Sequence, residues 1–264
     1  MSAPAISFLD RLADQRPLLG TLVSTESTEV AEALSLCGFE WLFIDLEHSA
    51  MDLAAAQHII QSVSPRTYSV IRLPDNSAEH FKKALDTGCD GVVVPMIKSV
   101  SEAERAVKFA KYPPLGERSV GLARAQAYGL NFDGYLKNAN RTIALILQIE
   151  HKEAVERVEE IVAVPGVDAI FIGPYDLSAS MGLLGQPSAP PVVEAIHRVR
   201  KACFNAKVPS GAFCMTAALA RGEIAAGSRL IVLGADLLFL TSGARVGLAS
   251  ITGICSETTV KNEN

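Results

Sequence analysis

Short apolar runs recur along the chain and alternate with segments in which apolar residues return every three or four positions. Such runs predict strands buried on both faces of a parallel sheet, and the periodic segments predict amphipathic helices. The expected strands are 18–24, 41–46, 69–73, 91–97, 143–149, 169–172, 209–214 and 230–233. The expected helices are 6–15, 28–37, 52–63, 77–87, 101–110, 152–162, 191–206 and 216–226, with a last helix after Asp236, near 237–240 or from 244 onward.

Strictly alternating strands and helices favour an α/β fold, the (β/α)8 TIM barrel, formed as a single domain over residues 1–255. An open doubly wound sheet is the alternative. It is disfavoured because no GxGxxG follows the first strand and polar residues recur at many strand ends. Ser101 and Glu104 predict a capping box at the start of helix 101–110. Residues 256–264 are expected to form a disordered tail.

Residues 111–141 interrupt this alternation with a long polar segment. A loop of that length inside a compact domain is usually functional. We therefore expect this excursion to contribute to a binding site.

Composition excludes several classes of protein. A net charge of -5 with interspersed signs argues against nucleic-acid binding and against a basic membrane-surface helix. No apolar run is long enough to span a membrane, and the first residues do not form a secretory signal. The five cysteines are scattered and odd in number, which predicts free thiols in a reducing compartment. A cytoplasmic location is expected.

Two expected neighbouring strands lead to carboxylates, Glu150 after the fifth and Asp176 after the sixth. Hard oxygen ligands on adjacent strand ends suit Mg²⁺ or Mn²⁺, with water or substrate completing the coordination. Each acid also has a simpler interpretation. Glu150 could favour the start of the next helix, and Asp176 could act as an N-cap.

Further polar residues follow other expected strands. His48 is a candidate general base, oriented by Asp45 or by Glu47, although it could be a structural histidine. Arg72 suits a carboxylate or an enolate oxygen. Lys98 is a candidate for a Schiff-base lysine, but a lysine there is more often solvated.

The chain resembles the metal-dependent (class II) pyruvate aldolases of the 4-hydroxy-2-oxoheptanedioate aldolase and 2-dehydro-3-deoxyglucarate aldolase type, which are related to the citrate lyase β chain. The resemblance covers about residues 17–250. It is carried by WLFIDLEHS, VIRLP, ALDTGCDGVVVPMIKS, YPPLGERSVGLARA, ILQIE and GVDAIFIGPYDLSASMG.

The resemblance implies cleavage of a 4-hydroxy-2-oxo acid to pyruvate and an aldehyde, and the reverse addition, through a metal-stabilised pyruvate enolate. It implies a divalent metal, Mg²⁺ or Mn²⁺ with Co²⁺ as a further candidate. It also implies a trimer or hexamer, often with an exchanged C-terminal helix.

The resemblance further implies roles for individual residues. The catalytic group would be His48 as base, Asp45 supporting it, Arg72 stabilising the enolate and Asp86 tuning the base. Gln148 would contact the substrate, Glu150 and Asp176 would bind the metal, and the backbone N–H groups of Tyr175 and Asp176 would bind the substrate carboxylate. A neighbouring subunit would complete the site through loop 113–130, with Arg118 or Arg124.

Departures from the family pattern concern the aldehyde. Leu46, Ser49 and Ala50 alter the first motif, Ser119 replaces a common glycine, and Cys214 stands where a larger apolar residue often lines the aldehyde pocket. Two alternative functions are a CoA-ester lyase of the citrate lyase β type and a non-catalytic barrel scaffold. No basic cluster dedicated to a nucleotide tail is evident, and a scaffold would not need both acids, His48 and Arg72.

Overall fold

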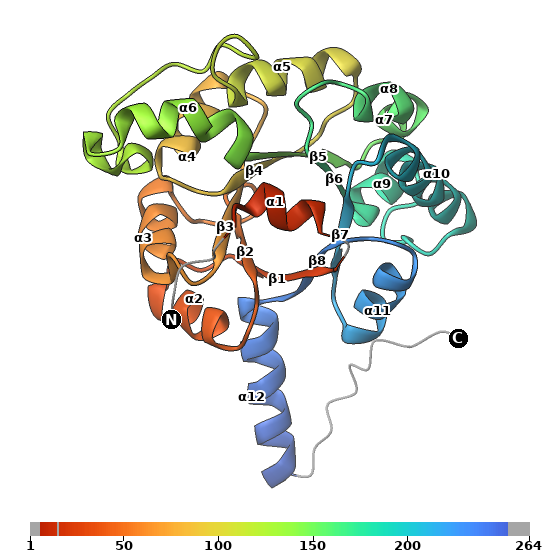
Figure 1. Ribbon diagram of the computed structural model, residues 1–264. Coiled ribbons are helices and arrows are strands. Elements are labelled where there is room, and N and C mark those ends of the chain that lie inside the picture. Colours follow the sequence, from red (N-terminus) through yellow and green to blue (C-terminus); the bar gives the residue numbers. More distant parts are fainter. Residues whose placement is uncertain (1–5, 15, 253–264) are drawn as a thin grey trace.

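The computed structural model describes residues 6–14 and 16–252. Eight strands close into one barrel in sequence order, and every neighbouring pair is parallel (Figure 1). The strands are β1 Leu18–Val23, β2 Trp41–Asp45, β3 Tyr68–Arg72, β4 Gly91–Val94, β5 Ala144–Ile149, β6 Ala169–Ile172, β7 Ser210–Cys214 and β8 Leu230–Ala235. This architecture confirms the predicted (β/α)8 barrel. The predicted tail at 256–264 lies outside the described residues.

Helices surround the barrel, as the alternation predicts. They are α1 Phe8–Ala13, α2 Thr28–Leu36, α3 Leu53–Val63, α4 Ala78–Asp86, α5 Val100–Ala110, the 3₁₀ helix η1 Arg124–Gly129, α6 Phe132–Thr142, α7 Lys152–Glu156, α8 Val158–Val162, α9 Pro174–Ser180, α10 Pro190–Ala206, α11 Ala217–Ala225 and α12 Asp236–Thr252. In the described chain, no helix is both long enough and apolar enough to cross a membrane.

The capping box of α5 was predicted two residues too late. Ser99, and not Ser101, caps the helix: its hydroxyl accepts from the N–H of Glu102, and the Glu102 carboxylate accepts from the N–H of Ser99. Glu102 also accepts from the N–H of Lys98 at 2.7 Å. The correct pair has the same Ser-x-x-Glu spacing, so spacing alone could not choose between the two.

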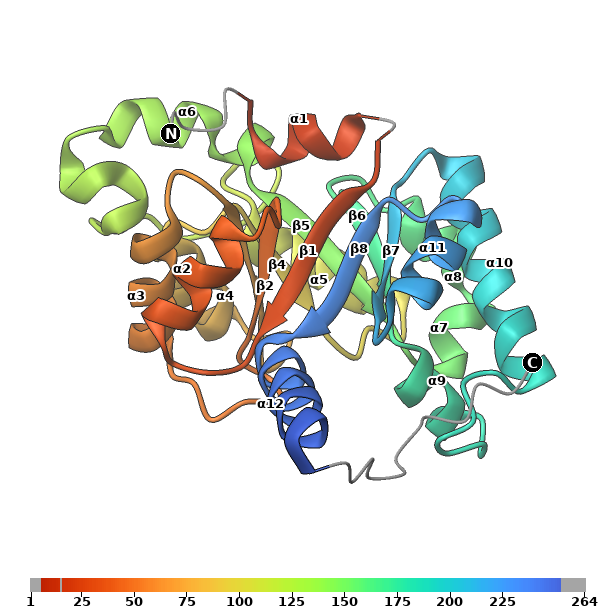
Figure 2. The same cartoon turned by 90° about the horizontal axis from the view of Figure 1, so that it is seen from below.

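The excursion at 111–141 is not an irregular loop, because it contains η1 and α6. Tyr135 and Leu136 of α6 pack against the main core, and Ala139 is buried. Their spacing is that of a helix face, but polar neighbours obscured the pattern. In Figure 2, α6 lies on the same side of the barrel as α1, whereas α9 and α12 lie at the opposite side, toward which the strand arrows point.

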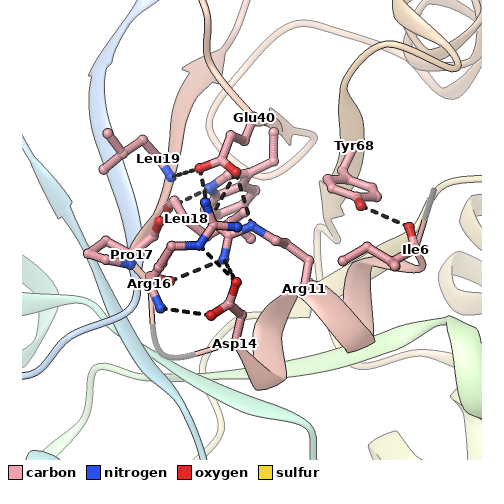
Figure 3. Close-up of polar contacts among 10 residues, drawn as sticks. Ile6, Arg11, Asp14, Arg16, Pro17, Leu18, Leu19, Glu40 and Tyr68 are labelled. Carbon is pink, nitrogen blue, oxygen red and sulfur yellow. Dashed lines mark hydrogen bonds and ion pairs between the residues drawn. The ribbon is translucent and has the colours of Figure 1, made fainter. Parts of the chain in front are cut away.

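The barrel interior is closed at its amino-terminal end by α1. Phe8 lies against Trp41 and Tyr68, with ring centroids 6.0 and 5.4 Å apart. The Arg11 guanidinium donates to both carboxylate oxygens of Glu40, at 2.9 to 3.1 Å, and to two backbone carbonyls (Figure 3). Because that end is filled and tied down, a ligand can enter only from the carboxyl ends of the strands.

The chain turns directly from β8 into α12 at Asp236, earlier than predicted. The Asp236 carboxylate accepts from both the N–H and the hydroxyl of Ser24 and of Thr25, at 2.8 to 2.9 Å. Asp236 is the one buried residue along this described helix. The helix projects from the barrel (Figures 1 and 2). Large apolar side chains are exposed along it, among them Leu237, Leu240, Val246, Leu248 and Ile251.

Candidate active site

A cavity of about 270 Å³ opens at the carboxyl ends of the strands. Its position is the usual one for an active site in this fold. It brings together six of the predicted site residues, from β2 and the turn after it, from β3 and β5, and from the first turn of α9 after β6. The full lining is Leu22, Phe43, Asp45, His48, Arg72, Gln148, Phe171, Ile172, Gly173, Pro174, Tyr175, Asp176, Phe213 and Val232.

Arg72 is fixed by carboxylates from the adjacent strand. Asp45 and Arg72 are register partners in β2 and β3, and the Arg72 guanidinium donates to both Asp45 oxygens at 2.8 and 2.7 Å. Burial alone would raise the pKa of Asp45, but the hydrogen bonds and charge of Arg72 hold it below its usual value. The guanidinium carbon of Arg72 lies over the Phe43 ring, 5.2 Å from the ring centroid. The cation is therefore rigidly oriented at the cavity wall.

Glu47 forms the second contact with this cation. Its Oε2 lies 3.1 Å from Nη1 of Arg72, yet that buried oxygen is not aligned with any hydrogen-bond donor. Burial, opposed by Arg72 and reinforced by the charge of Glu150, raises the pKa of Glu47 to about 7. The site thus contains more negative charge than its one arginine neutralises.

His48 lines the cavity with a side chain that is 66% exposed, so its imidazole is accessible to a substrate. Of the two acids considered for orienting the ring, Glu47 faces it, with its Oε2 at 3.8 Å from His48 Nε2. Asp45 instead accepts from the backbone N–H groups of Glu47 and His48 at 3.0 and 3.3 Å. Asp45 therefore shapes the turn and holds Arg72. The expected contact between Asp45 and the His48 imidazole is not formed.

Glu150 is buried behind the cavity. Its Oε1 accepts from the N–H of Met96 at 2.7 Å, and its Oε2 accepts from the side-chain amide of Gln148. Burial raises the pKa of Glu150 despite these hydrogen bonds, and the charge of Asp176 raises it further. Gln148 Oε1 is buried without a hydrogen-bond partner. Glu150 Oε2 lies next to Gly173, where an added Cβ would stand 2.7 Å from it.

The donor set fits a divalent cation. Glu150 and Asp176 follow adjacent strands, and their mutual repulsion would be relieved by a cation between them. No group of three or more His, Cys, Asp or Glu suited to a metal was found in residues 6–14 and 16–252. Two carboxylates with space for water and substrate are nonetheless a sufficient protein contribution for Mg²⁺ or Mn²⁺.

Asp86 is not brought to the cavity within one chain. It ends α4, which runs antiparallel to the strands, so it lies near the start of β4 and not at its carboxyl end. Its carboxylate accepts from the buried guanidinium of Arg118 at 2.9 Å, and Tyr112 and Tyr135 lie against that guanidinium. Arg124 lies in the same region and donates to the carbonyl of Thr87. The position of Asp86 close to β4 in sequence did not show at which end of the barrel its side chain lies.

Two other sequence expectations do not coincide with the cavity. Lys98 is not among the residues that line it. Cys214 points outward from β7 and packs with Ala220 and Ile231, whereas Phe213 points into the cavity. Successive strand residues face opposite sides of a sheet, so the residue of β7 that lines the cavity is Phe213 and not its neighbour Cys214, which was expected from the sequence. Burial also raises the pKa of the Cys214 thiol to about 12, which makes it a poor nucleophile.

Sequence reasoning missed contributions from Gly173 and Met215. Gly173 has φ -101°, which any residue can adopt, so the backbone conformation does not require glycine. A glycine is needed there because a Cβ would collide with the Glu150 side chain. Met215 follows β7, and its sulfur lies 3.5 Å from the Tyr175 hydroxyl at the rim. The alternation of inward and outward residues along the predicted strand could have indicated that Phe213 faces the cavity. No sequence signal indicates the contact between Tyr175 and Met215.

Comparison with known proteins agrees with this geometry. The model of the HpcH/HpaI aldolase/citrate lyase family matches residues 19–242. The chain belongs to this family. A hydroxypyruvate/pyruvate aldolase from Paraburkholderia phytofirmans is 38% identical over 249 residues, which cover 91% of this chain and 95% of that protein. A 4-hydroxy-2-oxo-heptane-1,7-dioate aldolase from Klebsiella pneumoniae is 34% identical, with 98% of each chain covered.

A solved HpcH/HpaI aldolase/citrate lyase family structure from Burkholderia cenocepacia has a TM-score of 0.89 and 37% identity to this chain, covering 92% of it and 98% of that structure. Aldolases and citrate lyases both act on a carbon–carbon bond. Membership of the HpcH/HpaI family therefore identifies the chain as a carbon–carbon lyase, and the resemblance seen in the sequence is confirmed.

Proposed function

We propose that this protein is a class II aldolase that cleaves a 4-hydroxy-2-oxo acid to pyruvate and an aldehyde and catalyses the reverse addition. The observation that carries the proposal is the convergence of His48, Arg72, Gln148 and Asp176 on one cavity, with Glu150 buried directly behind it. Relatives named as aldolases at 34 to 38% identity support this activity over a CoA-ester lyase or a scaffold.

Glu150 and Asp176 would hold a divalent cation, Mg²⁺ or Mn²⁺ with Co²⁺ as a further candidate. When bound, such a cation draws electron density from the 2-oxo group and so stabilises negative charge on its oxygen. Gln148 and the N–H groups of Tyr175 and Asp176, in the first turn of α9, would orient the carboxylate of the 2-oxo acid.

In the cleavage direction, His48 accepts the proton of the 4-hydroxyl group. The C4–O electron pair forms the aldehyde carbonyl, the C3–C4 bond breaks, and its electron pair passes to C3 and the 2-oxo oxygen as the pyruvate enolate. Arg72, fixed by Asp45, stabilises the enolate oxygen. Return of the proton from His48 to C3 gives pyruvate, so the reaction is balanced without a further reactant.

Two features support homo-oligomerisation. The apolar side chains along α12 require cover that the described barrel does not give them. Asp86 could tune the base only in the site of a second copy, because within one chain it lies at the far end of the barrel. We therefore propose a trimer or hexamer in which α12 is exchanged and the 113–130 loop, with Asp86, Arg118 and Arg124, adjoins a neighbouring site.

The test is pyruvate formation from a panel of 4-hydroxy-2-oxo acids, with Mg²⁺, with Mn²⁺ and after EDTA treatment. We expect turnover that requires the metal. Glu150→Ala and Asp176→Ala should each lower kcat/KM by at least about 100-fold and weaken Mn²⁺ binding, because each removes one of two protein ligands.

Asp133→Ala is the matched control, since Asp133 is an exposed acid on α6 at the other end of the barrel. It should leave both activity and Mn²⁺ affinity unchanged. Turnover that survives EDTA would refute the class II assignment. Wild-type Mn²⁺ affinity in either ligand variant would refute the ligand assignment alone.

A further inference from the structure

The cavity has two chemically different halves. The side formed by β2, β3, β5 and the turn after β6 carries the polar groups, Asp45, His48, Arg72, Gln148 and Asp176. The opposite side is formed by β7, β8 and β1, which are consecutive in the closed barrel. It presents Phe213, Val232 and Leu22, and no polar side chain from these strands lines the cavity in the part of the chain that the structure describes.

The polar half accommodates the pyruvate portion of the substrate, as the proposed function requires. The fragment beyond the C3–C4 bond then lies toward the apolar half, because the other side of the cavity within this barrel is occupied by the pyruvate portion. Its chemical class must therefore suit Phe213, Val232 and Leu22.

Within one chain, an anionic group on that fragment would find no counter-ion. The arginines that a neighbouring subunit would bring are already engaged, Arg118 with the Asp86 carboxylate and Arg124 with the carbonyl of Thr87. Arg72 is the only arginine or lysine lining the cavity within the described residues, and it already contacts Asp45 and Glu47. At the neighbouring rim, the hydroxyls of Ser24 and Thr25 donate to Asp236. A carboxylate moved from water against the apolar wall would lose hydration without gaining a partner.

The rim above this wall is closed by a contact between two loops. Tyr175 lies in the first turn of α9 after β6, Met215 follows β7, and the Tyr175 hydroxyl lies 3.5 Å from the Met215 sulfur. Both side chains are about half exposed, 48% and 43%, so they form the edge of the opening and not part of the core. Because the Tyr175 hydroxyl donates to the Met215 sulfur, these two uncharged side chains extend the wall to the mouth without adding a cation.

On the basis of the proposed aldolase function, we propose that the aldehyde partner is uncharged, selected by the wall of Phe213, Val232 and Leu22 and by the rim of Tyr175 and Met215. An aliphatic or hydroxylated aldehyde without a carboxylate fits this surface. A semialdehyde of a dicarboxylic acid does not.

The experiment compares butanal with succinate semialdehyde as acceptors for pyruvate in the addition direction. The two have the same number of carbons and differ by the terminal carboxylate. We expect kcat/KM for butanal to exceed that for succinate semialdehyde by at least about tenfold. A ratio of one or below would overturn the proposal.

Met215→Lys then supplies the missing cation at the rim, and Leu219→Lys is its matched control, because Leu219 is exposed on α11 and does not line the cavity. Met215→Lys should shift the ratio toward succinate semialdehyde by at least about tenfold, and Leu219→Lys should not change it. An equal shift in both variants would show a general charge effect and overturn the assignment of the rim. Should Met215→Lys fail to fold, the wild-type ratio still decides the proposal.

Decarboxylation of oxaloacetate separates this inference from the function on which it rests, because loss of CO₂ gives the same pyruvate enolate without any aldehyde. Decarboxylation together with a preference for succinate semialdehyde, or with no addition to either aldehyde, would overturn the aldehyde assignment and leave the enolate chemistry standing. Failure of decarboxylation, addition and cleavage together would overturn both proposals.

Discussion

Replacing Gly173 by alanine tests whether the site depends on the space beside Glu150. A Cβ at this position would lie 2.7 Å from Glu150 Oε2, 2.8 Å from Glu150 Cβ and 3.3 Å from Gln148 Nε2. Nonbonded carbon atoms rest at about 3.5 to 4.0 Å, so the Glu150 side chain would have to move by about 1 Å. The backbone itself tolerates alanine, because φ is -101°.

A displacement of about 1 Å in a catalytic constellation can cost about 100-fold in rate, and overpacking costs about 1 to 3 kcal/mol in stability. We therefore expect Gly173→Ala to remain folded, with a Tm lower by several degrees, but to lose about 100-fold in kcat/KM and to bind Mn²⁺ more weakly. Pyruvate release, a Mn²⁺ titration and a thermal unfolding curve measure the three effects.

Gly222→Ala is the control, because nothing lies within 4 Å of its added Cβ and the residue is in the middle of α11. Alanine there should stabilise the helix by about 0.5 to 1 kcal/mol and leave activity unchanged. If Gly173→Ala retained wild-type kcat/KM and Mn²⁺ affinity, Glu150 would not be the positioned ligand inferred above.

Two further predictions concern buried carboxylates. Asp236→Asn should lower stability by about 2 to 4 kcal/mol at pH 7, since an amide cannot accept all the hydrogen bonds from Ser24 and Thr25. Burial would raise the pKa of Asp236, but these hydrogen bonds lower it below 3.8, so the wild-type advantage should be fully present above pH 3.8 and should decline as pH falls from there through the lowered pKa. Urea unfolding at pH 7 and pH 3.5 checks this, and equal midpoints at pH 7 would contradict it. The pKa of Glu47 is raised from 4.5 to about 7, so the folded chain keeps a proton that the unfolded chain has lost, and stability should fall as pH rises through that window. Glu47→Gln should flatten this slope in a pH series of unfolding curves, and an unchanged slope would exclude Glu47 as its source.

The barrel could be predicted from sequence because each strand is a compact apolar run and each helix has its own periodicity. WLFID at 41–45 is fully buried, as such a run requires. The failures arose where the pattern was weak or ambiguous. In α6, polar residues masked a helix whose apolar side chains are few, and at α5 two serines offered the same capping spacing.

Residues at strand ends could be assigned to one face of the barrel, and the cavity gathers His48, Arg72, Gln148 and Asp176 as that logic predicts. What sequence could not resolve was the partner of each group. Asp45 and Glu47 both lie within three residues of His48 in the chain, and only the register of β2 with β3 shows that Asp45 binds Arg72. Sequence alone could not place Asp86 either, because closeness to a strand in sequence does not show at which end of that strand the residue lies.

The direct passage from β8 into α12 has a mechanical consequence. A helix of 17 residues is about 25 Å long, and this one is rooted at its first residue, where Asp236 binds Ser24 and Thr25 at the edge of the strand ends. By simple leverage, a rotation of about 5° at that root would carry the far tip through about 2 Å. In the proposed oligomer, the angle between two barrels would therefore be set by a few hydrogen bonds near the substrate cavity, and not along the length of α12.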